Sequence, residues 1–546
     1  MTATALFEAL KNTQDGDVIT LKKDAEIDVW SDECPFVSGY HFSNTATYEE
    51  NPNGDRPVSI YLKGKKNIVI DGNGAEIKIH GIMTPFLFDR CENITLKNIK
   101  FDYARPTMSE FDILEKRGEG TYLLRILPES LFEIEGNNLI WCGEKGKSGS
   151  ALWKNHYRDP LNIAMYRSPE TKHVKMMENE NGLKFPCIPE FKKIERIGER
   201  ELLVTLENKN AFFPVGCRIQ TRKTVRDQIG GCFTLCKNVM FENSSIYAMH
   251  GLGILAQYCD GILYDRITIV PRNGRTIASN ADFFQMSGCK GEVIIQDCVL
   301  EGGHDDFINI HGTHLKIVEK SGKKIKVRFC NPNSRGFEAF FANDTVDFIN
   351  NRTLVPYESA TVEKATKIND TDIELQFDKD CSAQIGDCAE NATWTPSVVI
   401  KNNRFGPSMG RGILCTTRKD VLIKDNIFYK LGGSVLCIED DCNFWYESGF
   451  IGKLTFQKNT VIDCGYGTTE TPQPVIWCYP QILGFDKDVY PHKKLIIKEN
   501  YFSHLPKESY RIGIYHVEKV IYDKNVSDQK MRIVCKYVKQ FVDNKR

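Results

Sequence analysis

The sequence predicts an all-β fold: a right-handed parallel β-helix with two inserted β-barrel or β-sandwich subdomains. Three observations lead to this prediction. A short apolar pattern recurs along the chain, the distance between its copies is at least about one coil of a solenoid, and helical periodicity is nearly absent. Degenerate repeats at such a period are typical of folds in which each repeat packs on its neighbours.

Each copy of the repeat has two or three alternating apolar β-formers, a polar pair that often contains Asn, and another apolar residue. Copies begin at Ile94, Val239, Val293, Val398, Val421, Leu454 and Leu495, with a looser copy at Ile68. Alternation directs the apolar side chains into the coil. The recurring Asn is expected to stack from rung to rung at a bend and to share amide hydrogen bonds.

The spacing between copies favours coils over a β-sandwich. From Val398 to Val421 is 23 residues, and from Val421 to Leu454 is 33. A minimum near 23 with a variable excess fits three short strands per coil, with extra residues looping out at a corner. A β-sandwich of similar strand density is the alternative. Thr2 to Lys11 carries the clearest helical pattern and is expected to cap the first coil.

Two long regions interrupt the repeat with alternating strand patterns of their own. Examples are Glu201 to Leu206 and Lys323 to Phe329. Five segments are therefore predicted. They are an N-terminal cap with the first coils (1–107), an inserted β-barrel (108–226), coils that carry reactive aspartates (227–315), a second inserted barrel (316–395), and the C-terminal coils and tail (396–546).

Composition narrows the class of partner. The 546 residues include 71 basic and 72 acidic ones, a balance that gives no reason to expect nucleic acid or an anionic membrane. No apolar stretch approaches the roughly 20 residues of a membrane span. Met1 to Leu10 lacks the pattern of a signal peptide, so the expected location is the cytoplasm, or a secreted or periplasmic one with the leader already removed. The 19 cysteines show no zinc-type spacing. They are expected to be buried thiols, which favours a reducing compartment, and neither metal nor cofactor is expected.

Reactive side chains concentrate in one segment. Asp282 lies 23 residues, one predicted coil, before Asp305, and Asp306 follows directly. The sequence therefore predicts that Asp282 and Asp305 lie over one another on adjacent rungs, about 4.8 Å apart along the axis. The neighbouring residues His304, Asn309 and His311 are expected to bind the substrate. Paired Asp residues also cap turns, but three within one coil favour a catalytic site.

Carboxylates this close do not ionise independently, so one pKa rises while another stays low. Glycoside hydrolysis uses such a raised acid beside an ionised base. Asp305 is interpreted as the general acid, and Asp282 and Asp306 as the pair that holds the attacking water. That arrangement gives an inverting mechanism.

A second cluster lies downstream, between Glu439 and Gly449. Aromatic faces stack on sugar rings while carboxylates take up hydroxyl groups, so Asp441, Trp445 and Glu447 are predicted to bind substrate. Trp445 packed beneath a loop is the alternative. Arg411, just before an apolar strand, is expected to reach the same groove.

Several motifs match one known family in order. They are Met83 to Phe86, the Asp282 segment, His304 to Gly312, Arg411 to Leu414, and Asn443 to Gly449. From about Gly39 to Phe502 the chain resembles glycoside hydrolase family 110, whose members are α-1,3-galactosidases, some acting on blood-group B antigens. The resemblance implies a β-helix with two inserted barrels. It also implies an exo-acting, inverting, metal-independent enzyme that releases terminal α-linked galactose, with Asp282, Asp305 and Asp306 as its catalytic aspartates.

Three rival functions remain open. A galacturonide-cleaving β-helix enzyme calls for Lys and Arg near its carboxylates, and the segment Asn280–His314 holds only Lys290. A polysaccharide lyase needs a base and a charge-neutralising cation or Arg, and the sequence shows no clear calcium site. A non-catalytic carbohydrate-binding β-helix gains nothing from stacked carboxylates. The expected partner is an oligosaccharide or glycoconjugate with terminal α-galactose, and the sequence leaves the oligomeric state open.

Overall fold

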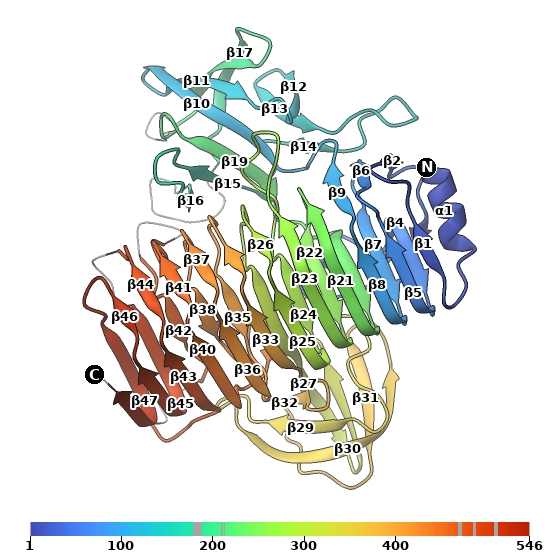
Figure 1. Ribbon diagram of the computed structural model, residues 1–546, viewed down its shortest axis with the longest axis vertical. Coiled ribbons are helices and arrows are strands. Elements are labelled where there is room, and N and C mark those ends of the chain that lie inside the picture. Colours follow the sequence, from blue (N-terminus) through green and yellow to red (C-terminus); the bar gives the residue numbers. More distant parts are fainter. Residues whose placement is uncertain are drawn as a thin grey trace.

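The chain winds through three short strands per turn, and equivalent strands of successive turns pair in parallel (Figure 1). The computed structural model describes residues 2–177, 188–208, 211, 213–467, 472–483, 487–506 and 511–544. Almost all its regular structure is β, which confirms the all-β prediction. Helix α1 (Ala3–Lys11) begins after Thr2, whose hydroxyl accepts from the amide of Ala5, and its buried Leu6 and Leu10 close the first turn of the stack.

The first sheet carries the polar face described below. Its strands are β4 (Arg56–Lys63), β7 (Thr84–Asp89), β20 (Ile229–Thr234), β22 (Leu252–Gln257), β24 (Phe284–Ser287), β27 (Ile308–Ser321), β35 (Ile413–Cys415), β38 (Leu436–Ile438), β42 (Ile476–Cys478), the start of β45 (Ile512–Asp523) and of β47 (Ile533–Asn544). Two antiparallel additions, β3 (Phe36–Val37) on β4 and β39 (Glu447–Ser448) on β27, bring outlying loops onto this sheet.

The second sheet follows in each turn. Its strands are β1 (Val18–Thr20), β5 (Lys66–Asp71), β8 (Glu92–Lys97), β21 (Lys237–Ile246), β23 (Asp260–Ile269), β25 (Lys290–Gln296), β33 (Ser397–Lys401), β36 (Asp420–Lys424), β40 (Lys453–Gln457), β43 (His492–Lys498) and the ends of β45 and β47. Inward residues such as Val421 and Ile423 are buried, while Leu422 between them points out.

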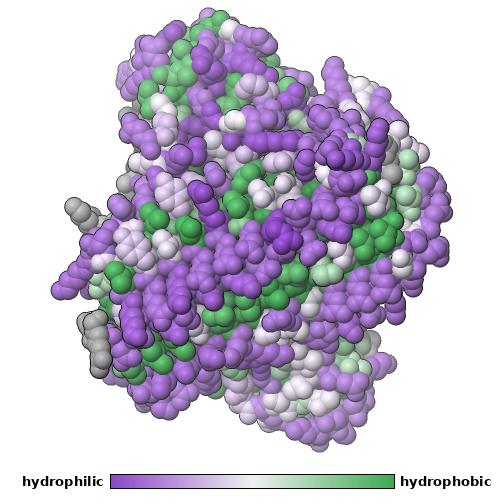
Figure 2. Space-filling view, in the orientation of Figure 1, coloured by the Kyte–Doolittle hydropathy of each residue, from purple (hydrophilic) through white to green (hydrophobic). Residues whose placement is uncertain are grey.

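Outward residues of the second sheet form an apolar row. Met240, Leu263, Ile294, Val399 and Leu422 are paired in register from strand to strand. Figure 2 shows this row as a green diagonal stripe between hydrophilic bands. The third sheet completes each turn with β2 (Glu26–Trp30), β6 (Glu76–His80), β9 (Lys100–Tyr103), the ends of β21 and β23, β26 (Val299–Leu300), β34 (Arg404–Phe405), β37 (Ile427–Tyr429), β41 (Thr460–Ile462), β44 (Tyr501–Ser503) and β46 (Val526–Ser527).

An asparagine ladder runs along the bend between the second and third sheets. Asn403, Asn426, Asn459 and Asn500 each donate from Nδ2 to Oδ1 of the next asparagine, at 2.8–3.1 Å, and the last acceptor is Asn525. The residue before each rung adopts a left-handed backbone, for example Asn402 at φ 58° and Asp425 at φ 55°. Because every turn bends at the same place, the amides stack as the sequence predicted.

Two antiparallel regions leave the stack on opposite sides (Figure 1). The first contains β10 (Ser109–Gly118), β11 (Thr121–Ile126), β12 (Leu131–Glu135), β13 (Asn138–Cys142), β14 (Lys154–His156), β15 (Asn162–Arg167), β16 (Val174–Met176), β17 (Phe191–Arg196), β18 (Glu201–Leu206) and β19 (Arg218–Lys223). Seven of these strands pair in the order β16-β15-β19-β10-β11-β18-β17, and β12, β13 and β14 form a separate sheet. Within the described residues the seven-stranded order does not close on itself.

The second antiparallel region is a closed ring of strands. The distal half of β27 pairs with β28 (Lys324–Arg328), followed by β31 (Asp372–Phe377), β30 (Pro356–Lys367), β29 (Thr345–Ile349) and β32 (Cys388–Asn391), which returns to β27. Closure leaves no free strand edge in this region. Cysteines of the described residues are free thiols, most of them buried. No helix among the described residues is long and apolar enough to cross a membrane.

Candidate active site

The three aspartates meet at the start of β24 and β27, on adjacent turns of the first sheet. Each offers a carboxylate oxygen within 4.8 Å of the other two. The register pairs Phe284 with Ile308, residues 24 apart, and so sets Asp306 over Asp282. The prediction that Asp305 lies over Asp282 is therefore wrong by one position. This turn has one residue more than the 23-residue minimum, which the spacing of the repeat did not reveal.

Asp306 is buried and is held by a guanidinium from the next turn. Arg411 Nε donates to its Oδ1 at 2.7 Å, and Arg411 Nη2 donates to its Oδ2 at 2.8 Å. Burial raises the pKa of Asp306 to about 6, although Arg411 acts to lower it. Arg411, expected to bind substrate, thus binds a candidate catalytic carboxylate with both of its parallel donors.

Asp305 is the most exposed of the three, with 33% of its side chain accessible. Arg226 Nη2 donates to its Oδ2 at 2.9 Å. No hydrogen bond from the described residues reaches its Oδ1. This carboxyl group therefore keeps one oxygen available to a ligand.

Asp282 is nearly inaccessible, and Asn309 Nδ2 donates to its Oδ2 at 3.3 Å. Burial first, and then the charges of Asp305 and Asp306, raise its pKa well above the ordinary value of an Asp. These surroundings therefore favour the protonated form of Asp282.

Beside the aspartates, His311 points from β27 toward Glu447 of β39. His311 Nδ1 donates to the carbonyl of Gly312 at 2.6 Å, which leaves Nε2 to accept from Gln285 at 3.0 Å. Glu447 Oε1 lies 3.6 Å from that Nε2 and accepts from Asn44 at 2.6 Å. These groups present amide, imidazole and carboxylate functions of the kind that bind sugar hydroxyls.

His304 is part of the support of the site. It is buried, accepts at Nδ1 from Arg222 at 3.1 Å and donates from Nε2 to Gln220 at 2.8 Å, so the first antiparallel region holds it from both sides. Burial, then the charge of Arg222, holds its pKa well below the ordinary value. A neutral imidazole between two strand residues orients the turn that carries Asp305.

The downstream cluster divides in the structure. Asp441 is buried and accepts from the backbone amides of Asn443, Phe444, Trp445 and Tyr446, so it shapes this loop. Trp445 is 41% exposed and packs edge-on against the still more exposed Phe444. Of the three residues predicted here to bind substrate, Glu447 lies beside His311, Trp445 lies at the surface, and Asp441 is occupied by the backbone.

Sequence reasoning missed Arg226, Asn44 and Gln285. Arg226 is 56 residues before Asp282, at the end of the first antiparallel region, and Asn44 comes from a loop before β4. Asn44 and Arg226 also touch, because Arg226 Nη1 donates to the Asn44 carbonyl at 3.3 Å. Only Gln285 had a signal in the sequence, since it lies three residues after Asp282 in a segment already singled out.

The same three carboxylates are the candidate metal ligands of the described residues. A divalent cation takes oxygen ligands of this kind. Both oxygens of Asp306 and one of Asp305 are bound by guanidinium groups, which already supply positive charge at the positions a cation would share.

Comparison with known proteins supplies the family. Residues 324–388, which span β28 to the start of β32, match the family model described as GLAA-B beta-barrel domain II. Alpha-1,3-galactosidase A of Bacteroides thetaiotaomicron is 33% identical over 472 residues, 85% of this chain and 78% of the relative. The protein of the same name from Akkermansia muciniphila is 34% identical over 490 residues, 88% of this chain and 76% of the relative.

The chain belongs to glycoside hydrolase family 110. It is therefore a glycoside hydrolase. Among solved structures, a family 28 exopolygalacturonase of Yersinia enterocolitica aligns with 99% of this chain and 74% of its own, at 8% identity and a TM-score of 0.34, a likeness too low to bear on the fold.

Proposed function

We propose that this family 110 protein is an exo-acting, inverting α-1,3-galactosidase that removes terminal galactose from blood-group B type glycans, linear α-galactosides or both. The observation that carries the proposal is the group of three aspartates whose carboxylates lie within 4.8 Å of one another. The names of the relatives, which are α-1,3-galactosidases, support galactose as the sugar released.

In the proposed reaction, Asp305 protonates the leaving oxygen from its free Oδ1. It is the most exposed carboxyl group of the three, and Arg226 occupies only its Oδ2. Asp305 receives this proton from Asp282, whose raised pKa favours the protonated carboxyl group. Transfer leaves Asp282 ionised, so that Asp282 and Asp306 together hold the attacking water and accept its proton. The C1–O bond breaks as water oxygen bonds to C1, and the aglycone leaves as an alcohol.

The short separation of the carboxylates limits this mechanism. Acid and base of inverting enzymes usually lie roughly 6.5–9.5 Å apart. The proposed water must therefore sit beside the aspartate cluster, held jointly by two carboxylates. Direct attack by Asp306 is disfavoured because Arg411 donates to both of its oxygens. Asp282 is too buried to reach an anomeric carbon.

A galacturonidase is the second candidate function, and the pairing of charges speaks against it. An acidic sugar calls for an unpaired cation at the site. Arg226 and Arg411 are each paired with an aspartate. A neutral sugar asks for no such cation.

The fold and its insertions belong to the same proposal. Parallel pairing of three strands per turn supports a right-handed parallel β-helix. The two antiparallel regions, assigned to residues 108–226 and 316–395, are proposed to be inserted subdomains that form the sides of the active site. Contacts of Gln220 and Arg222 with His304 support this for the first region, and the continuation of β27 beyond His311 supports it for the second.

The anomer released tests the proposal. The purified chain is incubated with Gal-α-1,3-Gal and with the fucosylated B trisaccharide, while NMR follows the anomeric protons. β-Galactose appearing first, with turnover at least about 1000-fold lower in Asp305→Asn, would support the proposed acid and inversion. The matched control is Asp297→Asn, at an exposed bend position that Asn402 occupies on the next turn. α-Galactose appearing first contradicts inversion, and no release from either sugar contradicts the proposed substrate.

A further inference from the structure

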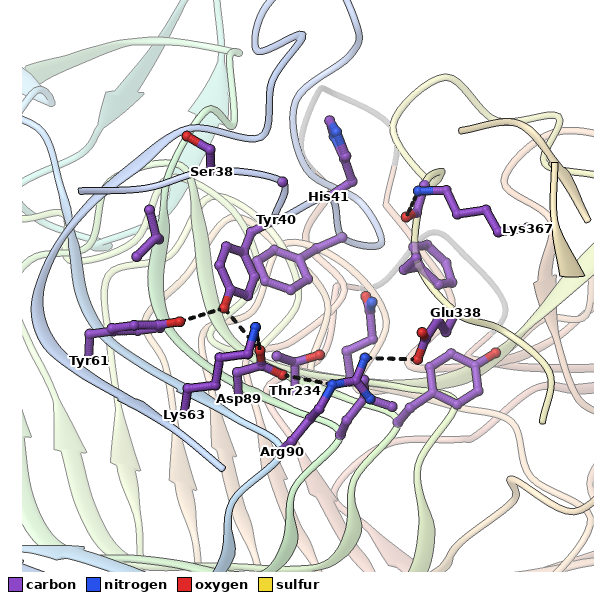
Figure 3. Close-up of a pocket in the computed structure, with 18 residues that line it drawn as sticks. Ser38, Tyr40, His41, Tyr61, Lys63, Asp89, Arg90, Thr234, Glu338 and Lys367 are labelled. Carbon is purple, nitrogen blue, oxygen red and sulfur yellow. Dashed lines mark hydrogen bonds and ion pairs between the residues drawn. The ribbon is translucent and has the colours of Figure 1, made fainter. Parts of the chain in front are cut away.

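A polar cavity lies on the first sheet, apart from the aspartates. It has a volume of about 480 Å³, within the range of small-ligand sites. Its floor is formed by the ends of β4, β7, β20 and β22, and its walls come from the loop before β4 and from Gly336 to Glu338 of the second antiparallel region (Figure 3). Phe42 lines the cavity, and Asn44 of the same loop binds Glu447 beside the aspartates.

The charges around the cavity are paired with one another. Lys63 Nζ lies 3.0 Å from Asp89 Oδ2, and Arg90 Nη2 lies 3.0 Å from Glu338 Oε2. Lys367 is bound to Asp370 at 2.8 Å. Figure 3 shows the first two pairs as dashed contacts across the floor. Opposite charges cancel in pairs, so the lining favours neither an anion nor a cation.

Two buried polar side chains of the floor each have a hydrogen-bonding group without a partner among the described residues. Gln257, 2% exposed, accepts at Oε1 from the amide of Ser43 at 2.8 Å, and this contact fixes which end of its amide is free. No hydrogen bond within the described residues engages its Nε2, nor the hydroxyl of the buried Thr234 beside it. Buried polar groups gain from a partner, and both side chains line the cavity.

These groups lie in a straight row. Asp89, Thr234 and Gln257 are paired in register on successive strands, so they repeat at about the 4.8 Å strand spacing. Tyr40 adds an aromatic ring beside the row, and its hydroxyl is anchored on Asp89 at 3.0 Å and on Tyr61 at 2.9 Å. A row of hydrogen-bonding groups next to an aromatic face is the usual chemistry of sugar recognition.

The row continues to the candidate active site. Gln257 pairs with Ser287, and Ser287 pairs with His311. The loop between the sites contacts both of them, since Ser43 binds Gln257 while Asn44 binds Glu447. Two strand spacings, about 10 Å, separate Gln257 from His311.

We propose that this cavity is a second carbohydrate-binding site. It holds one neutral sugar residue of a bound glycan while the aspartates act on another sugar residue of the same glycan. This second site goes beyond the proposed function. It rests on that function only for the choice of a galactose-containing probe. Binding in the cavity requires none of the three aspartates.

The test uses lactose, a neutral β-galactoside. Crystals of the full chain are soaked in lactose, and its binding in solution is titrated by ligand-observed NMR. We expect a sugar ring hydrogen-bonded to Thr234 and Gln257. Thr234→Val should weaken binding about fivefold, the effect of one hydrogen bond, whereas Thr95→Val, at a buried site of β8, should leave it unchanged.

A blocking variant guards against misfolding of Thr234→Val. Ser38→Trp adds bulk at the exposed mouth of the cavity and should abolish binding there. Sugar at the aspartates alone, sugar at neither place, or density in the cavity with unchanged solution affinity in both variants would overturn the second site. Galactose release from Gal-α-1,3-Gal and from the B trisaccharide is assayed separately. A protein that binds lactose in the cavity but releases galactose from neither substrate refutes the proposed function alone.

Discussion

Arg411 donates two parallel hydrogen bonds to Asp306 across adjacent turns of the stack, at 2.7 and 2.8 Å. The two residues are 105 apart in sequence, because the second antiparallel region lies between them. A buried carboxylate is thereby kept available in its charged form. The pairing makes Arg411 a positioning residue for Asp306 and leads to the first two predictions.

Activity should fall on the acidic side near pH 6. Burial raises the pKa of Asp306 to about 6, and the proposed water needs Asp306 ionised. The carboxylate therefore becomes protonated, and inactive in this role, as the pH falls through that value. The profile of kcat/KM against pH measures this ionisation in the free enzyme. An acidic limb near pH 4 would exclude Asp306 as the limiting group.

Replacing Arg411 with Gln should move that acidic limb to higher pH. The guanidinium lowers the pKa of Asp306, so its removal raises this pKa further and lowers kcat/KM about 100-fold at pH 7. Arg404→Gln, on the exposed side of β34, is the control and should keep the wild-type profile. Loss of activity with an unmoved limb would indicate that Arg411 acts on the substrate instead.

The asparagine ladder should matter for stability and not for catalysis. Asn426 accepts from the amide of Asn403 and donates to the carbonyl of Ile400, both buried contacts within the stack. Asn426→Ala leaves these groups unpaired and should lower the free energy of unfolding by about 3 kcal/mol. Urea denaturation measures the loss. Asn402→Gly, at φ 58°, should change stability by less than about 0.5 kcal/mol, and an equal loss in both variants would refute the role of the ladder.

Asp440 should make the protein less stable as the pH rises. Burial raises its pKa to about 7, against the lowering effect of His314. An unfolded Asp loses its proton near pH 4, so between about pH 4 and 7 the folded chain holds a proton that the unfolded chain has released. Stability from this group is complete below pH 4 and is lost as pH approaches 7.

Asp440→Asn should remove this pH dependence. Between pH 5 and 7 the free energy of unfolding should then fall by about 2 kcal/mol less than in the wild type. Denaturation midpoints across this range give the comparison. Asn keeps an oxygen for the amide of Gly449, which now binds Asp440 Oδ1 at 3.2 Å. The exposed Asp420→Asn serves as control and should follow the wild type. Parallel curves for all three proteins would refute the assignment.

Much of the fold and the centre of the site were predictable because they depend on local patterns. Alternating residues such as Val421 and Ile423 identify strands, and a repeated Asn identifies the bend. Asp282, Asp305 and Asp306 stand in one segment, so their proximity needed only the length of a turn. That length was off by one residue, because a loop residue adds to the count without changing the apolar pattern.

The residues that surround the aspartates could not be predicted from the sequence, for a physical reason. Arg226 and Asn44 reach the site through contacts between segments that no sequence period relates. His304 was assigned to the substrate because of its neighbours, yet both of its ring nitrogens are bound by Gln220 and Arg222. In a bend, the side chains of adjacent residues point to different partners. Nearness in sequence therefore gives little information about where a side chain points.

The ladder of asparagines also bears on how such a chain changes over generations. Residues 23 apart, such as Asn403 and Asn426, occupy the same place on successive turns. Duplication or loss of one such stretch would preserve every bend and every amide contact around it, whereas insertion of a few residues within a strand would break the register. Duplication or deletion can thus lengthen or shorten the protein by whole turns while the turn that carries the aspartates is unchanged.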